Sequence, residues 1–166
     1  MNLLIKNANI IDAYENFNGD ILIIDGKISE IGKEINKTEV ETIDAKGLTL
    51  MPAFIDTHAH FREPGLTHKE DIESGSKAAA KGGYTGVCLM ANTWPVCSNY
   101  EVLNHVRNRA KEVNLCNILP FSSVSKGEKG EELTDFVSLK NAGAIAFLDD
   151  GMPVVRAKIM RDAMIK

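Results

Sequence analysis

The 166-residue sequence predicts an α/β fold in which a small antiparallel β unit precedes four βα units that share a parallel sheet. Three observations lead to this prediction. Residues 1 to about 50 hold only short β-rich segments, the residues after Pro52 alternate between apolar strands and amphipathic helices, and polar side chains follow several strands. Four βα units fit an open doubly wound sheet or half of a (β/α)8 TIM-like barrel. Both folds place active residues at the carboxyl ends of strands.

The N-terminal segment, residues 1–52, is predicted to form the β unit. Asp25-Gly26 separates two of its apolar runs and is a strong signal for a two-residue hairpin turn. The unit has few residues with which to build a core, so we expect it to pack on another part of a protein. Its predicted strands are residues 3–11, 20–24, 27–32, 39–44 and 48–50.

Residues 53–166 are predicted to form the alternating part. The apolar run Met51–Ile55 predicts a fully buried first strand, and Thr67 is a plausible N-cap for the first helix. Gly82-Gly83 and Gly143 follow helical patterns, as expected of helix ends. The predicted helices are residues 68–81, 99–113, 131–142 and 154–166, and the later strands are residues 84–90, 115–121 and 144–148.

Composition excludes several classes of function. The net charge of −4 argues against nucleic acid as a partner. The N-terminus lacks the features of a signal peptide, and no apolar run approaches the ~20 residues of a membrane span. Three cysteines without CxxC spacing are typical of reduced thiols, which indicates a cytoplasmic protein. Neither GxGxxG nor GxxxxGK[ST] occurs, so nucleotide binding of the Rossmann or P-loop type is disfavoured.

The first predicted strand leads into His58-Ala59-His60, a pair of histidines at i and i+2. In a strand such side chains point to the same face, so two neutral imidazoles can bind one metal ion. Arg62 continues this spacing and offers a planar fork suited to a carboxylate. The alternative interpretation is a half-buried polar face without function. Two of the four histidines at ligand spacing favour the metal interpretation.

Two further strand ends carry polar residues, Asn92 and the pair Asp149-Asp150. Alone, Asn92 before Trp94-Pro95 is typical of a turn, and Asp149-Asp150-Gly151 is typical of a turn with a helix cap. Parallel strands bring their carboxyl ends to one edge, however, and two histidines with a carboxylate from another strand form a plausible zinc site. The combination therefore favours a metal centre.

Longer motifs then indicate a family. The chain resembles the amidohydrolase superfamily, and within it the zinc-dependent bacterial-type dihydroorotases. Ala53 and Ala91 depart from this pattern, because the family commonly has glycine and proline there. The matching segments are DTHAHFREPG at residues 56–65, KEDIESG at 69–75, AAAKGG at 78–83, MANTWPV at 90–96 and AIAFLDDG at 144–151.

The resemblance implies a fold, a reaction and a set of site residues. Residues 1–52 would belong to a small β-sandwich domain, and residues 53–166 would form the first half of the metal-dependent hydrolase barrel. The implied reaction is the reversible cyclisation of N-carbamoyl-L-aspartate to L-dihydroorotate in pyrimidine biosynthesis, with one or two zinc ions. Its metal ligands would be His58, His60 and Asp150, and its substrate-binding residues His60, Arg62 and Asn92.

Related cyclic-amide hydrolases, the allantoinases and dihydropyrimidinases, usually carry a carboxylated lysine at the strand end where this chain has Asp150. The absence of a lysine there favours dihydroorotase. These relatives remain one alternative. A catalytically inactive homologue that acts as a scaffold for aspartate transcarbamoylase is the other.

Length adds a further expectation, because a complete (β/α)8 barrel needs ~250 residues. We expect the general base beyond Lys166, no catalytic acid or base within residues 1–166, and no turnover of dihydroorotate by this chain alone. Exposed strand edges would favour self-association into a homo-oligomer. The expected partners are the small-molecule substrate and, by the resemblance, aspartate transcarbamoylase, without nucleic acid or membrane.

Overall fold

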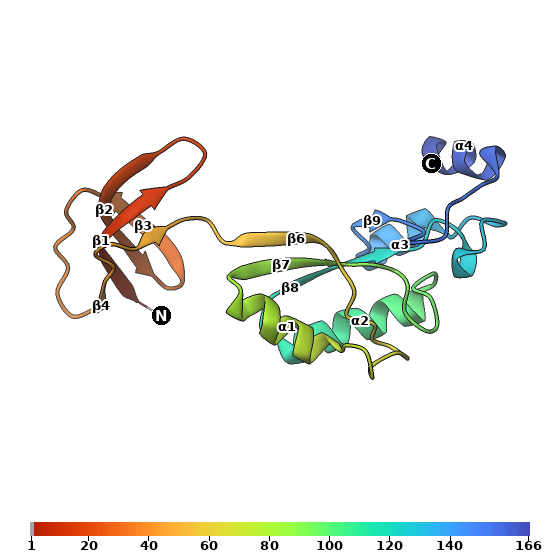
Figure 1. The fold of residues 1–166 in the computed structure, drawn as a ribbon, viewed down its shortest axis with the longest axis horizontal. Helices are drawn as coiled ribbons and strands as arrows, with labels where there is room; N and C mark the ends of the chain where they lie inside the picture. Colours follow the sequence, from red (N-terminus) through yellow and green to blue (C-terminus); the bar gives the residue numbers. More distant parts are fainter. Residues whose placement is uncertain (1) are drawn as a thin grey trace. The chain divides into compact units, whose positions relative to one another are not determined.

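A computed structural model describes residues 2–166 of the chain (Figure 1). The chain divides into two compact units, Met1–Pro52 and Ala53–Lys166. Within the described residues, no helix combines the length and the apolar character needed to cross a membrane.

The first unit is a five-stranded sheet in the order β3-β2-β1-β4, with β5 also paired to β1. The pairs β1–β2 and β2–β3 are antiparallel, but β4 and β5 run parallel to β1. The prediction of an antiparallel unit was therefore wrong for its last two strands. The strands are β1 Leu3–Ile11, β2 Asn16–Ile24, β3 Lys27–Gly32, β4 Glu41–Asp44 and β5 Thr49–Leu50.

The parallel pairing follows from the connection after β3. Residues 33–40 cross to the far side of β1, and Ile35 on this connection packs against buried Leu4 and Leu22. Asp20, which is 2% exposed, accepts hydrogen bonds from the backbone N–H groups of Asn7 and Ile35, at 2.9 Å each. The crossover is thereby fastened to the sheet. The predicted hairpin at Asp25-Gly26 is confirmed, with φ values of 52° and 73°.

The second unit is an α/β unit with a four-stranded parallel sheet in the order β6-β7-β8-β9. Figure 1 shows α1 and α2 side by side on one face of β6, β7 and β8. Its core includes a cluster of Phe61, Ile72, Val87, Leu89 and Val106 between sheet and helices. The elements are β6 Phe54–Ala59, α1 Ile72–Lys81, β7 Tyr84–Leu89, α2 Tyr100–Val113, β8 Asn117–Ser122, η1 Lys126–Glu128, α3 Phe136–Ala142, β9 Ala146–Phe147 and α4 Ala157–Ile165.

Three helices begin three or more residues later than predicted, and α2 begins one residue later. Helix α1 starts at Ile72 with Asp71 as N-cap, instead of near Thr67, because Asp71 and Ser74 form a reciprocal capping box. The Asp71 carboxylate accepts the Ser74 N–H at 2.7 Å. Helix α3 starts after the N-cap Asp135 and α4 after Arg156, so the charged residues that precede them lie in loops.

Strand β6 is not the fully buried strand that its apolar sequence predicts. Phe54 and Ile55 are 51% and 59% exposed. The reason is position, since β6 lies at the edge of the sheet and pairs only with β7 among the described residues. Apolar side chains on an edge strand are left without a second neighbour.

Gly75 in α1 provides a test of this packing. A Cβ atom at Gly75 would lie 2.4 Å from ring carbons of Phe61, so Gly75→Val forces the ring out of its place. We expect a loss of roughly 2 kcal/mol or more in the free energy of unfolding, measured by urea denaturation of the full-length protein. Ala78→Val, at an exposed position of the same helix, is the control for the cost of a β-branched residue. Equal losses in both variants would contradict the expectation.

Candidate metal centre

His58 and His60 lie where β6 gives way to a loop. The strand ends at Ala59, so His60 lies one residue beyond it rather than within it. The Asp56 carboxylate accepts the His58 backbone N–H at 3.0 Å, near the end of the strand. The two imidazole rings lie 5.0 Å apart between centroids, in an edge-on arrangement. Two imidazoles at one strand end are thus available together.

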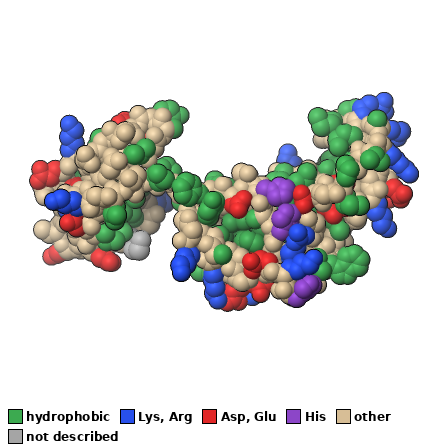
Figure 2. All heavy atoms as spheres, in the orientation of Figure 1, with side chains coloured by type: hydrophobic (Ala, Val, Ile, Leu, Met, Phe, Trp, Pro, Cys, Tyr) green, Lys and Arg blue, Asp and Glu red, His purple; other side chains and the backbone are tan. Residues whose placement is uncertain are grey.

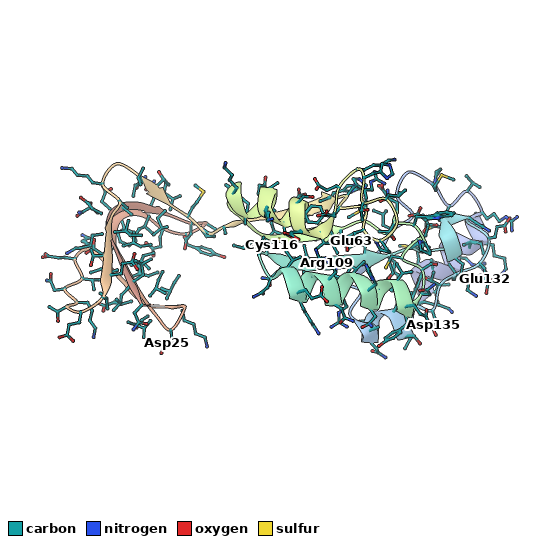
Figure 3. The ribbon with its side chains drawn as sticks, turned by 90° about the horizontal axis from the view of Figure 1, so that it is seen from below. Asp25, Glu63, Arg109, Cys116, Glu132 and Asp135 are labelled. Atoms are coloured by element: carbon teal, nitrogen blue, oxygen red, sulfur yellow. The ribbon has the colours of Figure 1, made fainter. Side chains whose placement is uncertain are left out.

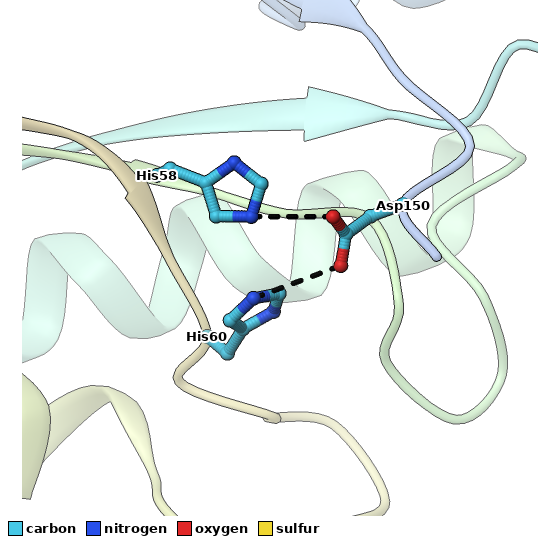
Figure 4. A group of neighbouring side chains, drawn as sticks. All are labelled: His58, His60 and Asp150. Atoms are coloured by element: carbon cyan, nitrogen blue, oxygen red, sulfur yellow. Dashed lines mark ion pairs between the residues drawn. The ribbon is translucent and has the colours of Figure 1, made fainter. Parts of the chain in front are cut away.

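Asp150 reaches the same place from the loop after β9. Its Oδ1 lies 3.2 Å from His58 Nε2, and its Oδ2 lies 3.6 Å from His60 Nε2 (Figure 4). The neighbouring Asp149 is buried, and its carboxylate accepts the backbone N–H of Ser125 at 3.0 Å and the hydroxyl of the same residue. Asp149 therefore anchors the loop, and Asp150 faces the histidines.

Asn92 links His60 to Asp150. Its Nδ2 donates to Asp150 Oδ2 at 2.6 Å, so its Oδ1 faces His60 Nδ1 at 3.0 Å. An amide oxygen only accepts, which assigns the proton of a neutral His60 ring to Nδ1 and leaves the Nε2 lone pair free. A ring nitrogen held in this way by an outer partner is the usual state of a metal-binding histidine.

The three side chains fit a metal ion. Their candidate ligand atoms all lie within 4.8 Å of one another. Ligand atoms held about 2.0–2.2 Å from a tetrahedral zinc ion lie roughly 3.3–3.6 Å apart. The two nitrogen–oxygen distances, 3.2 Å and 3.6 Å, are of this size, although they end on different oxygens of Asp150. The donors are two imidazole nitrogens and a carboxylate oxygen, which suit zinc and related divalent ions. This group is therefore able to bind a metal.

Arg62 lies beside the cluster but does not continue the strand as predicted. Its backbone has φ = 58°, in the left-handed region, and its NH1 group lies 3.4 Å from the backbone oxygen of Asn92. Its loop meets the loop after β7, because the Trp94 N–H donates to the Pro64 oxygen at 3.0 Å. Figure 2 shows histidine side chains next to acidic and basic side chains on this face of the second unit.

Glu128 is a charged neighbour that the sequence did not single out. It is 8% exposed at the end of η1, the short 3-10 helix after β8, and its Oε1 has no hydrogen-bond partner among the described residues. Burial, with the negative charge of Asp149, raises the pKa of Glu128, while the Asp150 backbone N–H and Arg62 oppose that shift. Its only sequence signal was the pair of glycines around it, Gly127 and Gly130, which adopt positive φ.

Solved structures with the same fold define the class of protein. An L-hydantoinase (dihydropyrimidinase) from Arthrobacter aurescens superposes with a TM-score of 0.73 over 87% of this chain and 32% of its own, at 24% identity. A D-hydantoinase gives a TM-score of 0.69 over 85% of this chain and 30% of its own, at 31% identity. The second unit therefore has the α/β fold of amidohydrolase-type enzymes.

The sequence model of the family described as "Dihydro-orotase-like" matches residues 47–166, and the chain belongs to this family. Curated relatives named dihydroorotase match it from end to end. The protein of Clostridium botulinum (strain Eklund 17B / Type B) is 54% identical over 99% of this chain and 42% of its own length. That of Aquifex aeolicus (strain VF5) is 49% identical over 99% of this chain and 39% of its own length. The chain thus spans about two fifths of the length of these relatives.

Asn92→Ala is expected to weaken metal binding while leaving the three candidate ligands in place. The variant removes the acceptor of His60 Nδ1–H and the donor to Asp150. Loss of such outer partners typically lowers metal affinity by about 10–100-fold. The measurement is a competition titration of zinc against a chelator, with Asn141→Ala, an exposed asparagine in α3, as the control. Equal zinc affinities in Asn92→Ala and the unchanged protein would contradict this role.

Proposed function

We propose that this chain is the N-terminal part of a zinc-dependent dihydroorotase, which interconverts N-carbamoyl-L-aspartate and L-dihydroorotate in pyrimidine biosynthesis. The observation that carries the proposal is the cluster of His58, His60 and Asp150, whose candidate ligand atoms lie within 4.8 Å of one another. Membership of the dihydro-orotase-like family supports the choice of substrate. A cyclic amide is hydrolysed in one direction and formed with loss of water in the other.

The proposed metal ligands are His58, His60 and Asp150, which would hold one or two zinc ions. When bound, zinc supplies a Lewis acid for the amide carbonyl and lowers the pKa of a water molecule. The chain's own contribution is orientation. Asn92 holds the proton on His60 Nδ1 and aligns the Asp150 carboxylate.

Arg62 is the proposed site for the carboxylate of the substrate, with Asn92 and His60 next to it. A guanidinium binds a carboxylate through two parallel N–H donors, which fixes both position and angle. The NH1 group of Arg62 lies only 3.4 Å from the Asn92 backbone oxygen, a weak contact that a carboxylate would readily replace. A carboxylate bound to Arg62 would orient the ring amide of the substrate toward the group formed by His58, His60 and Asp150.

The arrangement of the fold agrees with this proposal. We assign Ala53–Lys166 to the first four βα units of a (β/α)8 barrel, and residues 1–52 to part of a small β-sandwich domain. The parallel order β6-β7-β8-β9 supports the first assignment, because it is the order of consecutive strands in such a barrel. The sites lie after β6, β7 and β9, at the carboxyl end where barrel enzymes bind substrates.

The direct test is turnover of dihydroorotate by the purified full-length protein that contains this chain. We expect ring opening to carbamoyl-aspartate, loss of activity on dialysis against a chelator, and recovery when zinc is restored. Colorimetric detection of the ureido product follows the reaction. A metal-loaded, folded protein without activity in either direction would contradict the proposal.

A second candidate function is hydrolysis of hydantoins or dihydropyrimidines, which the similarity to a D-hydantoinase at 31% identity favours. Asp150 favours dihydroorotate instead, as does the absence of a lysine in the segment AIAFLDDG. Parallel assays with dihydroorotate, hydantoin and allantoin separate the candidates. Activity on hydantoin or allantoin without activity on dihydroorotate would support the alternative.

A further inference from the structure

The side chains of residues 60–63 point alternately toward the candidate site and toward the helices. His60 and Arg62 make their side-chain hydrogen bonds to Asn92, at the site. Phe61 is 8% exposed and lies in the core cluster with Ile72 of α1. The side chain of Glu63 is 12% exposed and contacts α1 and α2. Residues on both sides of Arg62 are therefore anchored away from the site.

The Glu63 carboxylate joins three parts of the unit. Its Oε2 accepts the backbone N–H of Ile72, the first residue of α1, at 2.9 Å. Its Oε1 lies 3.4 Å from Arg109 Nε in the middle of α2 (Figure 3) and 3.6 Å from His105 Nε2. A carboxylate at the first free N–H of a helix is favoured by the helix dipole. Glu63 thus fastens the loop to both helices.

Arg109 is held in place for this contact. Its guanidinium also pairs with Glu73 of α1 at 3.1 Å and with Glu112 of α2 at 3.3 Å. Its side chain is 31% exposed, and Glu63 is the most buried of its three acidic partners. An ion pair shielded in this way contributes more than a fully exposed one.

Arg62 needs such an anchor because of its backbone. A residue other than glycine with φ = 58° occupies a sparsely populated conformation, which persists where the surroundings impose it. The turn is closed by a hydrogen bond from the Leu66 N–H to the Arg62 carbonyl oxygen at 3.0 Å. Without Glu63, the turn would lose its tie to α1 and α2, and this hydrogen bond would open more often.

We propose that Glu63 is a positioning residue, whose ion pair with Arg109 and hydrogen bond to Ile72 hold Arg62 in the conformation that presents its guanidinium at the candidate metal centre. The inference rests on the proposed function to the extent that Arg62 binds the substrate carboxylate. It adds a residue that touches neither the metal ligands nor the substrate. Its effect should appear in substrate binding and not in metal binding.

The test compares matched variants of the full-length protein. Glu63→Gln keeps an acceptor for the Ile72 N–H but removes the charge that pairs with Arg109. We expect KM for dihydroorotate to rise roughly tenfold, with kcat within about twofold and zinc content unchanged. The rise in KM should be smaller in Arg109→Lys, which keeps the positive charge, than in Arg109→Gln. Glu112→Gln removes an Arg109 partner that belongs to α2 itself and should leave KM unchanged.

Amide hydrogen exchange supplies a readout that needs no turnover. The Leu66 amide, bonded to the Arg62 oxygen, should exchange roughly tenfold faster in Glu63→Gln and at the unchanged rate in Glu112→Gln. Unchanged Leu66 exchange overturns the proposal, and so does faster exchange together with an unchanged KM, since Glu63 would then be structural only. If the unchanged protein fails to act on dihydroorotate, the proposed function fails, and Leu66 exchange alone decides whether Glu63 holds the Arg62 turn.

Discussion

Replacing His60 by alanine in the full-length protein is expected to lower dihydroorotate hydrolysis by more than about 100-fold. Loss of an outer partner of a metal ligand already costs about 10–100-fold in affinity or activity, and His60 is itself a proposed ligand, so its loss should cost more. The variant also removes the partner of Asn92 Oδ1. Steady-state assays measure the loss of hydrolysis, and zinc analysis of the same preparation measures the loss of bound metal.

The matched control is His68→Ala. His68 is exposed in the loop before α1 and lies outside the His58–His60–Asp150 group. We expect it to keep zinc and activity near the level of the unchanged protein. A His60→Ala protein that retained full zinc content and activity would show that the cluster is not the metal centre.

Replacing Arg62 by alanine is expected to raise KM for dihydroorotate by roughly 100-fold, because a hydrogen bond between charged groups contributes about 1.5–3 kcal/mol. Zinc content should not change, since Arg62 is outside the group of candidate ligands. The KM of Arg62→Lys should lie between those of the unchanged protein and Arg62→Ala, because lysine keeps the positive charge but lacks the planar fork of donors. Initial rates over a range of substrate concentrations give the values of KM and kcat.

Arg161→Ala is the control for loss of an arginine charge. Arg161 is exposed in α4, and its side chain pairs with its neighbour Asp162. Its removal should leave KM unchanged. An unchanged KM in Arg62→Ala would show that the substrate carboxylate does not bind to Arg62. It would also remove the functional basis for the role of Glu63.

Local chemistry was predictable from the sequence because it depends on residues close together in the chain. The spacing of His58 and His60 places two imidazoles at one strand end, and their centroids lie 5.0 Å apart. Asp25-Gly26 forms the predicted hairpin turn. The alternation of strands and helices after Pro52 is present, with boundaries shifted by a few residues.

Errors arose from a competing local signal and from distant contacts that outweigh local preference. Thr67 is a plausible N-cap, but the capping box of Asp71 and Ser74 starts α1 later. The apolar sequence of β6 predicts burial, whereas its position at the sheet edge leaves Phe54 and Ile55 exposed. The buried position of Glu128 beside Asp149 depends on contacts between distant segments, and its only local signal was the pair Gly127 and Gly130.

The sequence by itself determined the types of donor available, their spacing within each strand end, and the order of strands and helices. Only the tertiary structure decided which side-chain atoms of the different strand ends meet and at what distance. Asn92 bonds to His60 across 32 residues and to Asp150 across 58, separations at which local propensity carries no information. Parallel pairing of β6, β7, β8 and β9 brings these residues together in space, because each crossover connection makes the next strand end at the same edge of the sheet. The histidine pair becomes a candidate metal centre because this pairing supplies Asp150, and the contacts of Glu63 with α1 and α2 anchor the segment that carries Arg62.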